Sequence, residues 1–321
     1  MPYHLRRLFA LLALLAVQPL AAQTYPSQPI RMVSPFPPGG SVDIMARLIA
    51  DPLGNQLGTR IIIDNRSGAS GNIGMEAAAR AAPDGYTVVL NTIPLVTNKS
   101  LFDKLNWDPI KDFAPIGMVA TGPHVLVVHP KLPVAKVEDL VRLARASPGK
   151  LSYASAGVGT TFHFCAEMFK DETGTNIVHV PHKASGEMRN SVIGGHVQMA
   201  FDAITTMTPN VKAGQVRALG TSASKRSTVL PDVPTIAEAG VPGYDSTIWL
   251  GIMAPAGTPK PIVDKLNAEI NKAINRPDVK EAWDKQGAAA LTMTPAEFDA
   301  YLRKDIDKWA QVVKAAGIKP E

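Results

Sequence analysis

Short apolar, β-rich runs alternate with amphipathic helical patterns along most of this chain. The run Ile30-Arg31-Met32-Val33 is typical of a strand, and a Pro/Gly cluster at 35–40 ends it. A helix is predicted next, with Ser41 as its N-cap, because apolar residues recur every three to four positions at Val42, Met45, Ile49 and Leu53. The succession of strand, glycine-containing loop and helix then repeats, which predicts an α/β fold with mostly parallel sheets.

The order of the predicted elements indicates two lobes. Further strands are predicted at 60–63, 87–90, 125–128, 151–153, 177–180, 197–201, 216–219 and 248–253. Further helices are predicted at 75–82, 137–146, 162–169, 235–239, 262–274 and 295–315. The last strand and helices can return to the first sheet, so one lobe is interrupted by the other. We expect connecting strands near 115–128 and 245–255, with lobe 1 formed by 23–122 and 247–321 and lobe 2 by 123–246.

The first 22 residues have the pattern of a secretory signal peptide. Arg6 and Arg7 precede an uninterrupted apolar run at 8–17, and the small residues of Leu20-Ala21-Ala22 are typical of a cleavage site. An N-terminal core helix is the alternative, but no polar residue interrupts the run. A run of about ten apolar residues is too short for a membrane span, which needs about 20. We therefore expect cleavage after Ala22 and export to the periplasm, which leaves 299 of the 321 residues.

Composition and charge exclude several classes of protein. The chain is 45% hydrophobic and 19% charged, which is ordinary for a globular protein with a core. Its single cysteine excludes an intramolecular disulfide framework and a zinc site built from several thiolates. Removal of two arginines with the signal peptide lowers the net charge from +5 to +3. Such a mild charge does not resemble the basic stripe that nucleic-acid binding requires.

Two glycine-containing loops between a strand and a helix are the strongest candidates for a binding site. They are Ser34-Pro35-Phe36-Pro37-Pro38-Gly39-Gly40-Ser41-Val42-Asp43 and Ala154-Ser155-Ala156-Gly157-Val158-Gly159-Thr160-Thr161. Glycines let the backbone approach a ligand, and the first N–H groups of a helix are free to bind an anion. A tight turn without a ligand is the alternative for each loop alone, but two such loops facing each other across a cleft would grip a small anion. The similar loop at 67–72 is more typical of packing.

Catalytic and metal-binding interpretations have less support. The sequence contains no G-x-S-x-G, P-loop or G-x-G-x-x-G motif. Cys165 with His163 could form a thiol nucleophile, but the surrounding helix is apolar, which favours a buried structural cysteine. His163 and Glu167 at i, i+4, and the separate His179-x-x-His182, have spacings that can hold a metal, yet scattered pairs of this kind are usually incidental. We therefore predict no catalytic residue, metal or cofactor.

Several short sequence motifs occur in order along nearly the whole chain after residue 22. Besides the loops at 35–43 and 155–160, they are Tyr25-Pro26-Ser27-Gln28-Pro29-Ile30, Asp64-Asn65-Arg66-Ser67-Gly68-Ala69, Ala82-Pro83-Asp84-Gly85-Tyr86-Thr87, Leu230-Pro231-Asp232-Val233-Pro234-Thr235, Trp249-Leu250-Gly251 and Ala254-Pro255-Ala256-Gly257-Thr258-Pro259. In these motifs the chain resembles the substrate-binding proteins of tripartite tricarboxylate transporters, also called Bug-type receptors.

The resemblance implies a two-lobed periplasmic-binding-protein fold of type II, in which the lobes close like a Venus flytrap. Such receptors capture di- and tricarboxylates, amino acids or aromatic acids and deliver them to a membrane permease. We expect this protein to be a monomer. The family holds the carboxylate through backbone N–H groups, hydroxyls and ordered waters of the two glycine loops. Carried over by position, this implicates Phe36, Gly39, Gly40, Ser41, Ala156, Gly157, Thr160 and Thr161. Asp202, which follows the strand at 197–201, is implied as a polar partner, and capping of the next helix is its alternative role.

The chain departs from the family pattern at one place. Relatives often have Tyr-Lys-Gly after the strand that ends here in Val180-Pro181, whereas this chain has His182-Lys183-Ala184. If this segment lines the cleft, the imidazole of His182 replaces an aromatic wall, which affects the choice of ligand but not its class.

Two rival functions stay open from the sequence. An exported hydrolase of small esters or amides would pair Ser155 or Ser41 with His163 or His182, although no motif supports either pair. A ligand sensor would use the same closing cleft but dock on a signalling protein rather than a permease.

Overall fold

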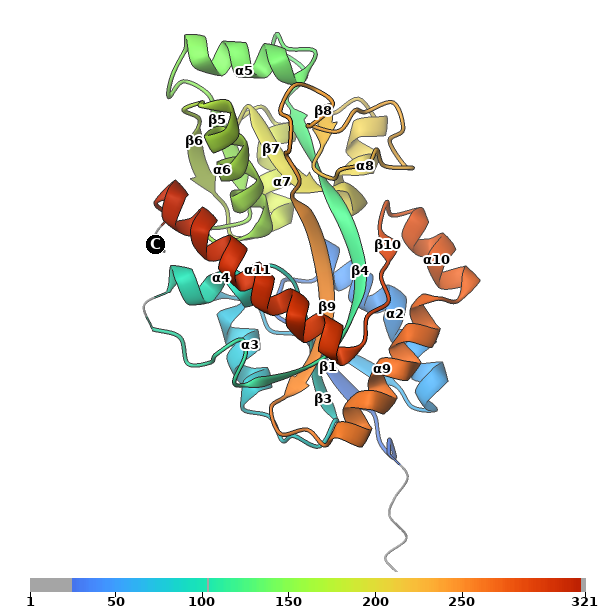
Figure 1. Ribbon diagram of the computed structural model, residues 1–321. Helices are drawn as coiled ribbons and strands as arrows, with labels where there is room; N and C mark the ends of the chain where they lie inside the picture. The colour runs from blue at the N-terminus through green and yellow to red at the C-terminus, as the bar shows by residue number, and fades with distance from the viewer. Residues whose placement is uncertain (1–24, 103, 319–321) are drawn as a thin grey trace, which may run out of the picture.

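Two long strands pass through both lobes and form the frame of the molecule (Figure 1). The computed structural model describes residues 25–102 and 104–318, so the predicted signal peptide lies outside the described residues. Strands β4 (Phe113–Val128) and β9 (Thr247–Pro255) pair antiparallel, from Phe113 opposite Pro255 to Pro123 opposite Thr247. They lie where the two connecting strands are predicted.

Lobe 1 is a sheet covered by helices on both faces. Its strand order is β2 (Ile61–Asn65), β1 (Ile30–Ser34), β3 (Thr87–Asn91), β9 and β4, with β10 (Ala289–Ala290) on β4. One face is covered by α2 (Ser41–Leu57), α9 (Lys260–Ile274) and α10 (Pro277–Asp284). The other face is covered by α3 (Asn72–Ala79), which follows the short 3-10 helix η1 (Ala69–Gly71), by α4 (Pro94–Leu101) and by α11 (Pro295–Ala316). Successive residues of β1 point to opposite faces, which is why Met32 and Val33 belong to different core clusters.

Lobe 2 repeats this layered arrangement around the far half of β4. Its strand order is β4, β7 (Met199–Ala203), β5 (Ser152–Ser155) and β6 (Val178–Pro181), with β8 (Arg217–Thr221) also paired with β4. Helices α5 (Val137–Ala146) and α6 (Thr161–Thr173) cover one face. Helices α7 (Ser185–Ile193) and α8 (Ile204–Lys212) cover the other. Each lobe therefore has its own core, and the two are joined by β4 and β9.

Helix α11 shows how local signals and packing act together. It begins at a capping box in which Thr294 and Glu297 each accept from the other's backbone N–H. Phe298, Leu302 and Trp309 recur on one face and are at most 2% exposed. This face packs on lobe 1, and Trp309 also contacts Phe164 of α6 in lobe 2, with ring centroids 5.1 Å apart. No helix within 25–102 and 104–318 has both the length and the apolar character needed to span a membrane.

Several sequence predictions need correction. The sheets are mixed rather than mostly parallel, because β9 and β4 run against their neighbours in both lobes. The predicted helix at 235–239 is a series of turns: the Ala239 N–H donates to the Thr235 carbonyl, but the next N–H group, that of Gly240, donates to the Ala237 carbonyl, so no second helical bond follows. Ser41 is the first residue of α2 rather than its cap; the N-cap is Gly40, in extended conformation and without a side-chain cap.

Candidate functional site

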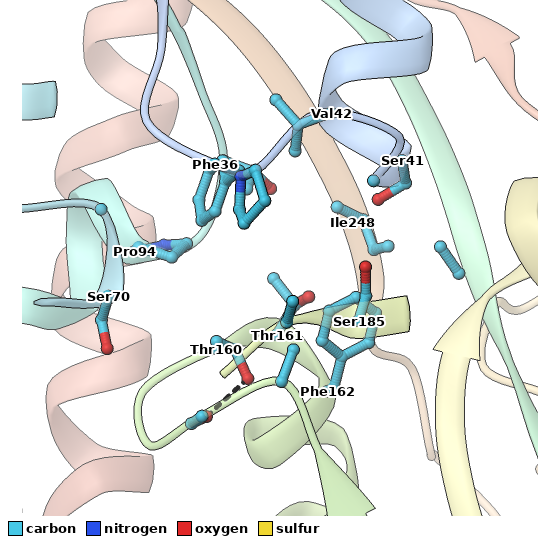
Figure 2. Close-up of a pocket in the computed structure, with 18 of the residues that line it drawn as sticks. Phe36, Ser41, Val42, Ser70, Pro94, Thr160, Thr161, Phe162, Ser185 and Ile248 are labelled. Carbon is cyan, nitrogen blue, oxygen red and sulfur yellow. Dashed lines mark hydrogen bonds between the residues drawn. The ribbon is translucent and has the colours of Figure 1, made fainter. Parts of the chain in front are cut away.

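A cavity of about 870 Å³ lies between the two lobes. Residues of β4, from Ala120 to Pro123, and Ile248 and Leu250 of β9 line it where these strands cross from one lobe to the other. Phe36 and Pro94 of lobe 1 and Thr160 and Phe162 of lobe 2 face one another across it (Figure 2). The walls that face each other thus come from segments far apart in the sequence.

Most of the cavity wall is apolar. The larger apolar lining side chains include Pro35, Phe36, Val42, Met45, Pro94, Phe102, Phe162, Ile248 and Leu250. A cavity of this kind binds a ligand largely through burial of an apolar body, with few polar groups that fix its orientation.

The polar groups of the cavity gather where helices of both lobes begin. Helix α2 of lobe 1 begins at Ser41, and helices α6 and α7 of lobe 2 begin at Thr161 and Ser185; all three residues line the cavity (Figure 2). A Cβ placed on Gly40 would lie 3.5 Å from Ser185 Oγ, so the starts of α2 and α7 approach each other across the cleft. None of the three helices has a side-chain cap. First-turn N–H groups lack intrahelical acceptors and carry the positive end of the helix dipole, so this region attracts an anion.

The loop before α6 is held in shape by its own backbone and by Ser155. Gly157 and Gly159 have φ of 116° and 79°, which side chains rarely adopt. The Gly157 N–H donates to Ser155 Oγ at 3.1 Å, and Thr160 Oγ1 donates to the Gly157 carbonyl at 2.7 Å. Thr160 therefore shapes the loop with its hydroxyl, whereas Thr161 Oγ1 lies 3.1 Å from Nε2 of the buried His124.

Two stacked histidines support this loop from behind. The rings of His163 and His179 lie 4.1 Å apart, and His163 Nδ1 accepts from the Gly159 N–H at 3.2 Å. Burial lowers the pKa of His163 to about 4, with Lys170 adding to the effect. Burial and the neighbouring His163 lower the pKa of His179 to about 3. Both rings are therefore neutral near pH 7, and the stack carries no charge repulsion.

The cavity brings together eight of the ten residues that the sequence implicates. Phe36, Gly40, Ser41, Ala156, Gly157, Thr160, Thr161 and His182 line it, and Lys183 and Ala184 follow His182 along the wall. Gly39 and Asp202 do not line it. The Gly39 N–H instead donates to Asp43 Oδ2 at 2.9 Å.

Asp202 lies behind the cavity wall and is fully buried. Its carboxylate accepts from Arg189 Nε at 2.8 Å, from the Ala203 N–H and from the Thr206 hydroxyl. Burial raises the pKa of Asp202, while Arg189 acts in the opposite direction. These bonds hold Asp202 inside lobe 2. Helix α8 has Ala203 as its N-cap and no side-chain cap, so Asp202 does not take the capping role that the sequence leaves as its alternative.

The sequence reasoning missed Thr92 and Thr205, which also line the cavity. Their hydroxyls are buried and have no partner within the described part of the chain. Thr92 directly follows β3, and Thr205 lies in the first turn of α8, after β7. Ligands in open α/β sheets bind at the carboxyl ends of strands, so the position of these residues was the available signal.

The described residues offer little for the catalytic alternatives. Ser155 Oγ does lie 2.6 Å from a histidine nitrogen, Nε2 of His179, but Ser155 is fully buried and its hydroxyl also contacts the backbone of Gly157. Cys165 is fully buried as predicted, and burial raises the pKa of its thiol to about 12. No group of three metal-ligating side chains is found within 25–102 and 104–318.

Known proteins resemble this chain over most of its length. A family model described as tripartite tricarboxylate transporter family receptor matches residues 45–318. The protein BugT of Bordetella pertussis (strain Tohama I) is 38% identical over 303 residues, which cover 94% of this chain and 93% of BugT.

Solved structures resemble the fold as well. Rpa4515 of R. palustris with adipate has a TM-score of 0.88 and 36% identity, covering 92% of this chain and 100% of that protein. MatC (Rpa3494) from Rhodopseudomonas palustris with bound malate has a TM-score of 0.84 and 31% identity, covering 90% and 100%.

Proposed function

Since this chain belongs to the tripartite tricarboxylate transporter receptor family, we propose that it captures a carboxylate with an extended apolar body and delivers it to a membrane permease. The family is one of solute-binding receptors, and periplasmic binding proteins are among its members. We accordingly propose that residues 1–22 export the chain to the periplasm, where it acts as a monomer.

One observation carries the proposal: the helix starts of both lobes meet at a largely apolar cavity. Ser41, Thr161 and Ser185 mark these starts, and the two charged lining residues, Lys183 and Glu187, are exposed. A micromolar affinity corresponds to about 8 kcal/mol, and each hydrogen bond to a charged group contributes about 1.5–3 kcal/mol. A few N–H and hydroxyl donors together with apolar burial therefore suffice without a buried salt bridge.

The apolar wall narrows the ligand class. Phe36, Phe102 and Phe162 offer ring faces and edges, and Met45 and Leu250 offer flexible or branched surface. Burial of apolar area contributes roughly 25 cal/mol per Å², so a ligand with an aliphatic chain or an aromatic ring gains more here than a compact hydroxy acid. Adipate is bound by one similar protein and malate by another, which supports a carboxylate but leaves this preference to experiment.

We also propose the lobe boundaries 23–122 with 247–321 for lobe 1 and 123–246 for lobe 2. The support is the change of partners along β4: pairing with β9 ends at Pro123 opposite Thr247, and pairing with β7 begins at His124 opposite Ala203. A hinge at this point would let the lobes separate without breaking either sheet.

A thermal-shift screen tests the function. Adipate, malate, benzoate and phenylacetate are each added to the protein, with adipamide as the uncharged control for adipate. Ligand at 100 times its dissociation constant stabilises the folded protein by about 2.7 kcal/mol. We expect stabilisation by adipate or an aromatic acid and none by adipamide; no stabilisation by any of the acids, or equal stabilisation by adipamide, would contradict the proposal.

The site is tested by Gly40→Val, which places a branched side chain between the starts of α2 and α7. We expect weaker binding in calorimetry with unchanged unfolding of the free protein. Ligand-dependent copurification with a membrane permease tests delivery, and copurification with a sensor kinase instead would favour the sensory alternative.

A further inference from the structure

Four side chains form a continuous row of polar contacts from the hinge to the cavity wall. Ser246, immediately before β9, has its Oγ 2.9 Å from Cys165 Sγ. Cys165 Sγ lies 3.0 Å from His124 Nδ1, and His124 Nε2 lies 3.1 Å from Thr161 Oγ1. Thr161 lines the cavity (Figure 2). The row therefore ends at the binding site.

The position of the row is fixed by the strands that join the lobes. His124 is the residue at which β4 begins to pair with β7. The His124 N–H donates to Ser222 Oγ at 2.8 Å, and Ser222 Oγ donates to the Ser246 carbonyl at 2.7 Å. His124 and Cys165 are 1% and 0% exposed, so water does not compete for their polar atoms.

The proton on His124 decides what Thr161 can offer to a ligand. A hydroxyl has one proton and two lone pairs. If His124 carries its proton on Nε2, it donates to Thr161 Oγ1, and the Thr161 proton is free to point into the cavity. If the proton is on Nδ1, Nε2 accepts the Thr161 proton, and the hydroxyl presents only lone pairs, which repel a carboxylate.

The neighbours of Nδ1 favour the first arrangement. The carbonyl of Ser246 is 3.5 Å from Nδ1, at the limit of a hydrogen bond, and already accepts from Ser222. The Cys165 sulfur is closer to Nδ1 than this carbonyl is. A thiol is a weak acceptor but can donate its S–H proton, so it pairs best with an Nδ1 that carries no proton. Ser246 Oγ–H can then donate to the sulfur, so every donor of the row has an acceptor except the Thr161 hydroxyl, which is left for a ligand.

We propose that Cys165 and His124 are positioning residues that hold the Thr161 hydroxyl as a hydrogen-bond donor toward an anionic ligand. The inference rests on the proposed function and extends it to two buried residues that do not touch the ligand. Burial lowers the pKa of His124 to about 3, so the ring stays neutral and keeps one donor and one acceptor nitrogen near pH 7. The site thereby prefers acceptor ligands such as carboxylates over groups that must donate.

The protonation of His124 is measured directly by ¹⁵N NMR of the histidine rings in the unliganded protein, with His124→Asn for assignment. We expect a protonated Nε2 in the wild type and in Cys165→Ser, which keeps a donor beside Nδ1. In Cys165→Ala the donor is lost, and we expect the proton to move to Nδ1, where the Ser246 carbonyl is the remaining acceptor. A protonated Nδ1 in the wild type, or the same tautomer in Cys165→Ala and the wild type, would overturn the proposal.

The effect on binding is measured by calorimetry with adipate as the probe. Loss of one hydrogen bond to a charged group corresponds to a roughly 10- to 100-fold weaker affinity. We expect a loss of this size for Cys165→Ala, a much smaller one for Cys165→Ser, and no further loss when Cys165→Ala is added to Thr161→Val. Thermal unfolding of each variant verifies that it is folded.

The double variant separates positioning from a general structural effect, because residues that act through Thr161 cannot act once its hydroxyl is gone. An equal loss in both backgrounds would therefore contradict the proposal. Failure of adipate and every other acid to bind the wild-type protein would contradict the proposed function instead, and the NMR measurement would still decide the state of His124.

Discussion

A hydrogen bond between the lobes makes closure of the cavity testable with one substitution. Ser70 of lobe 1 donates its hydroxyl to the Val158 carbonyl of lobe 2 at 2.6 Å. The loop around Ser70 is held in an unusual conformation, since residues 68–71 all have positive φ, with Ser70 at 53°. Its own carbonyl accepts from Asn98 Nδ2 at 3.0 Å, which fixes the loop on lobe 1. Ser70→Ala removes the bond between the lobes and leaves this anchor.

The expected size of the effect follows from the kind of bond that is lost. A neutral hydrogen bond contributes about 0.5–1.5 kcal/mol net, and 1.4 kcal/mol corresponds to a factor of ten in affinity. When the lobes separate, the hydroxyl and the carbonyl are free to bind water, so the substitution penalises the closed state only. Ligand affinity should therefore fall about 2- to 12-fold. Because the bond holds the two lobes together in the closed state, its loss should appear as faster dissociation rather than slower association.

Stopped-flow binding of the best carboxylate from the thermal-shift screen measures both rates. Ser224→Ala is the matched control, because Ser224 is exposed and does not line the cavity. Unchanged dissociation in Ser70→Ala, or a loss that lies wholly in the association rate, would refute the role of this bond in closure. An equal change in Ser224→Ala would show that the effect does not depend on the contact between the lobes.

Three further predictions concern single buried groups. Thr92→Val removes a buried hydroxyl that has no partner in the described chain. It should leave thermal unfolding unchanged and weaken carboxylate binding about tenfold. Unchanged affinity in calorimetry would exclude Thr92 from the site. Arg189→Ala leaves the fully buried Asp202 without its ion-pair partner and should destabilise the protein by about 3–5 kcal/mol in urea, with Arg189→Lys losing less. Burial lowers the pKa of His124 to about 3, so as pH falls the unfolded chain, with an ordinary histidine pKa near 6.5, binds the proton first. The contribution of His124 to stability is thus fully present above about pH 6.5 and falls by up to about 1.4 kcal/mol per pH unit below it, and His163 and His179, whose pKa values burial also lowers, add to the fall. Equal urea midpoints at pH 7 and 5 would contradict this, and His124→Asn should reduce the slope.

Elements with a clear periodic pattern were predicted well. Helix α5 has the predicted bounds, because Val137, Leu140 and Ala144 recur at helical spacing and are the residues that become buried. Helices α4, α7, α8 and α10 were missed. They are eight or nine residues long, and α8 contains Pro209. Their stability comes from packing on the sheet rather than from a local signal, since short helices are marginal by themselves.

The binding site was predicted at two of its three glycine loops. The third, at 67–72, was assigned to packing, but Ser67, Gly68, Ala69, Ser70 and Gly71 line the cavity. Gly40 and Gly157 could be found because a glycine before a helix leaves backbone N–H groups accessible. Phe162 was read from the sequence only as part of an apolar helical run, although it forms part of the cavity wall. From the sequence alone, Asp202 could equally bind the ligand or cap the next helix. In the structure its carboxylate is buried and forms an ion pair with Arg189.

The sequence by itself determined the alternation of strands and helices, the two glycine loops and the resemblance to carboxylate receptors, because these properties are set by neighbouring residues. The tertiary structure decided which groups meet. Ser70 and Val158 come together only after β4 and β9 have joined the lobes, and His124 and Cys165 only after α6 has packed on the sheet of lobe 2. No local period encodes such pairs, since they depend on packing between segments far apart in the sequence.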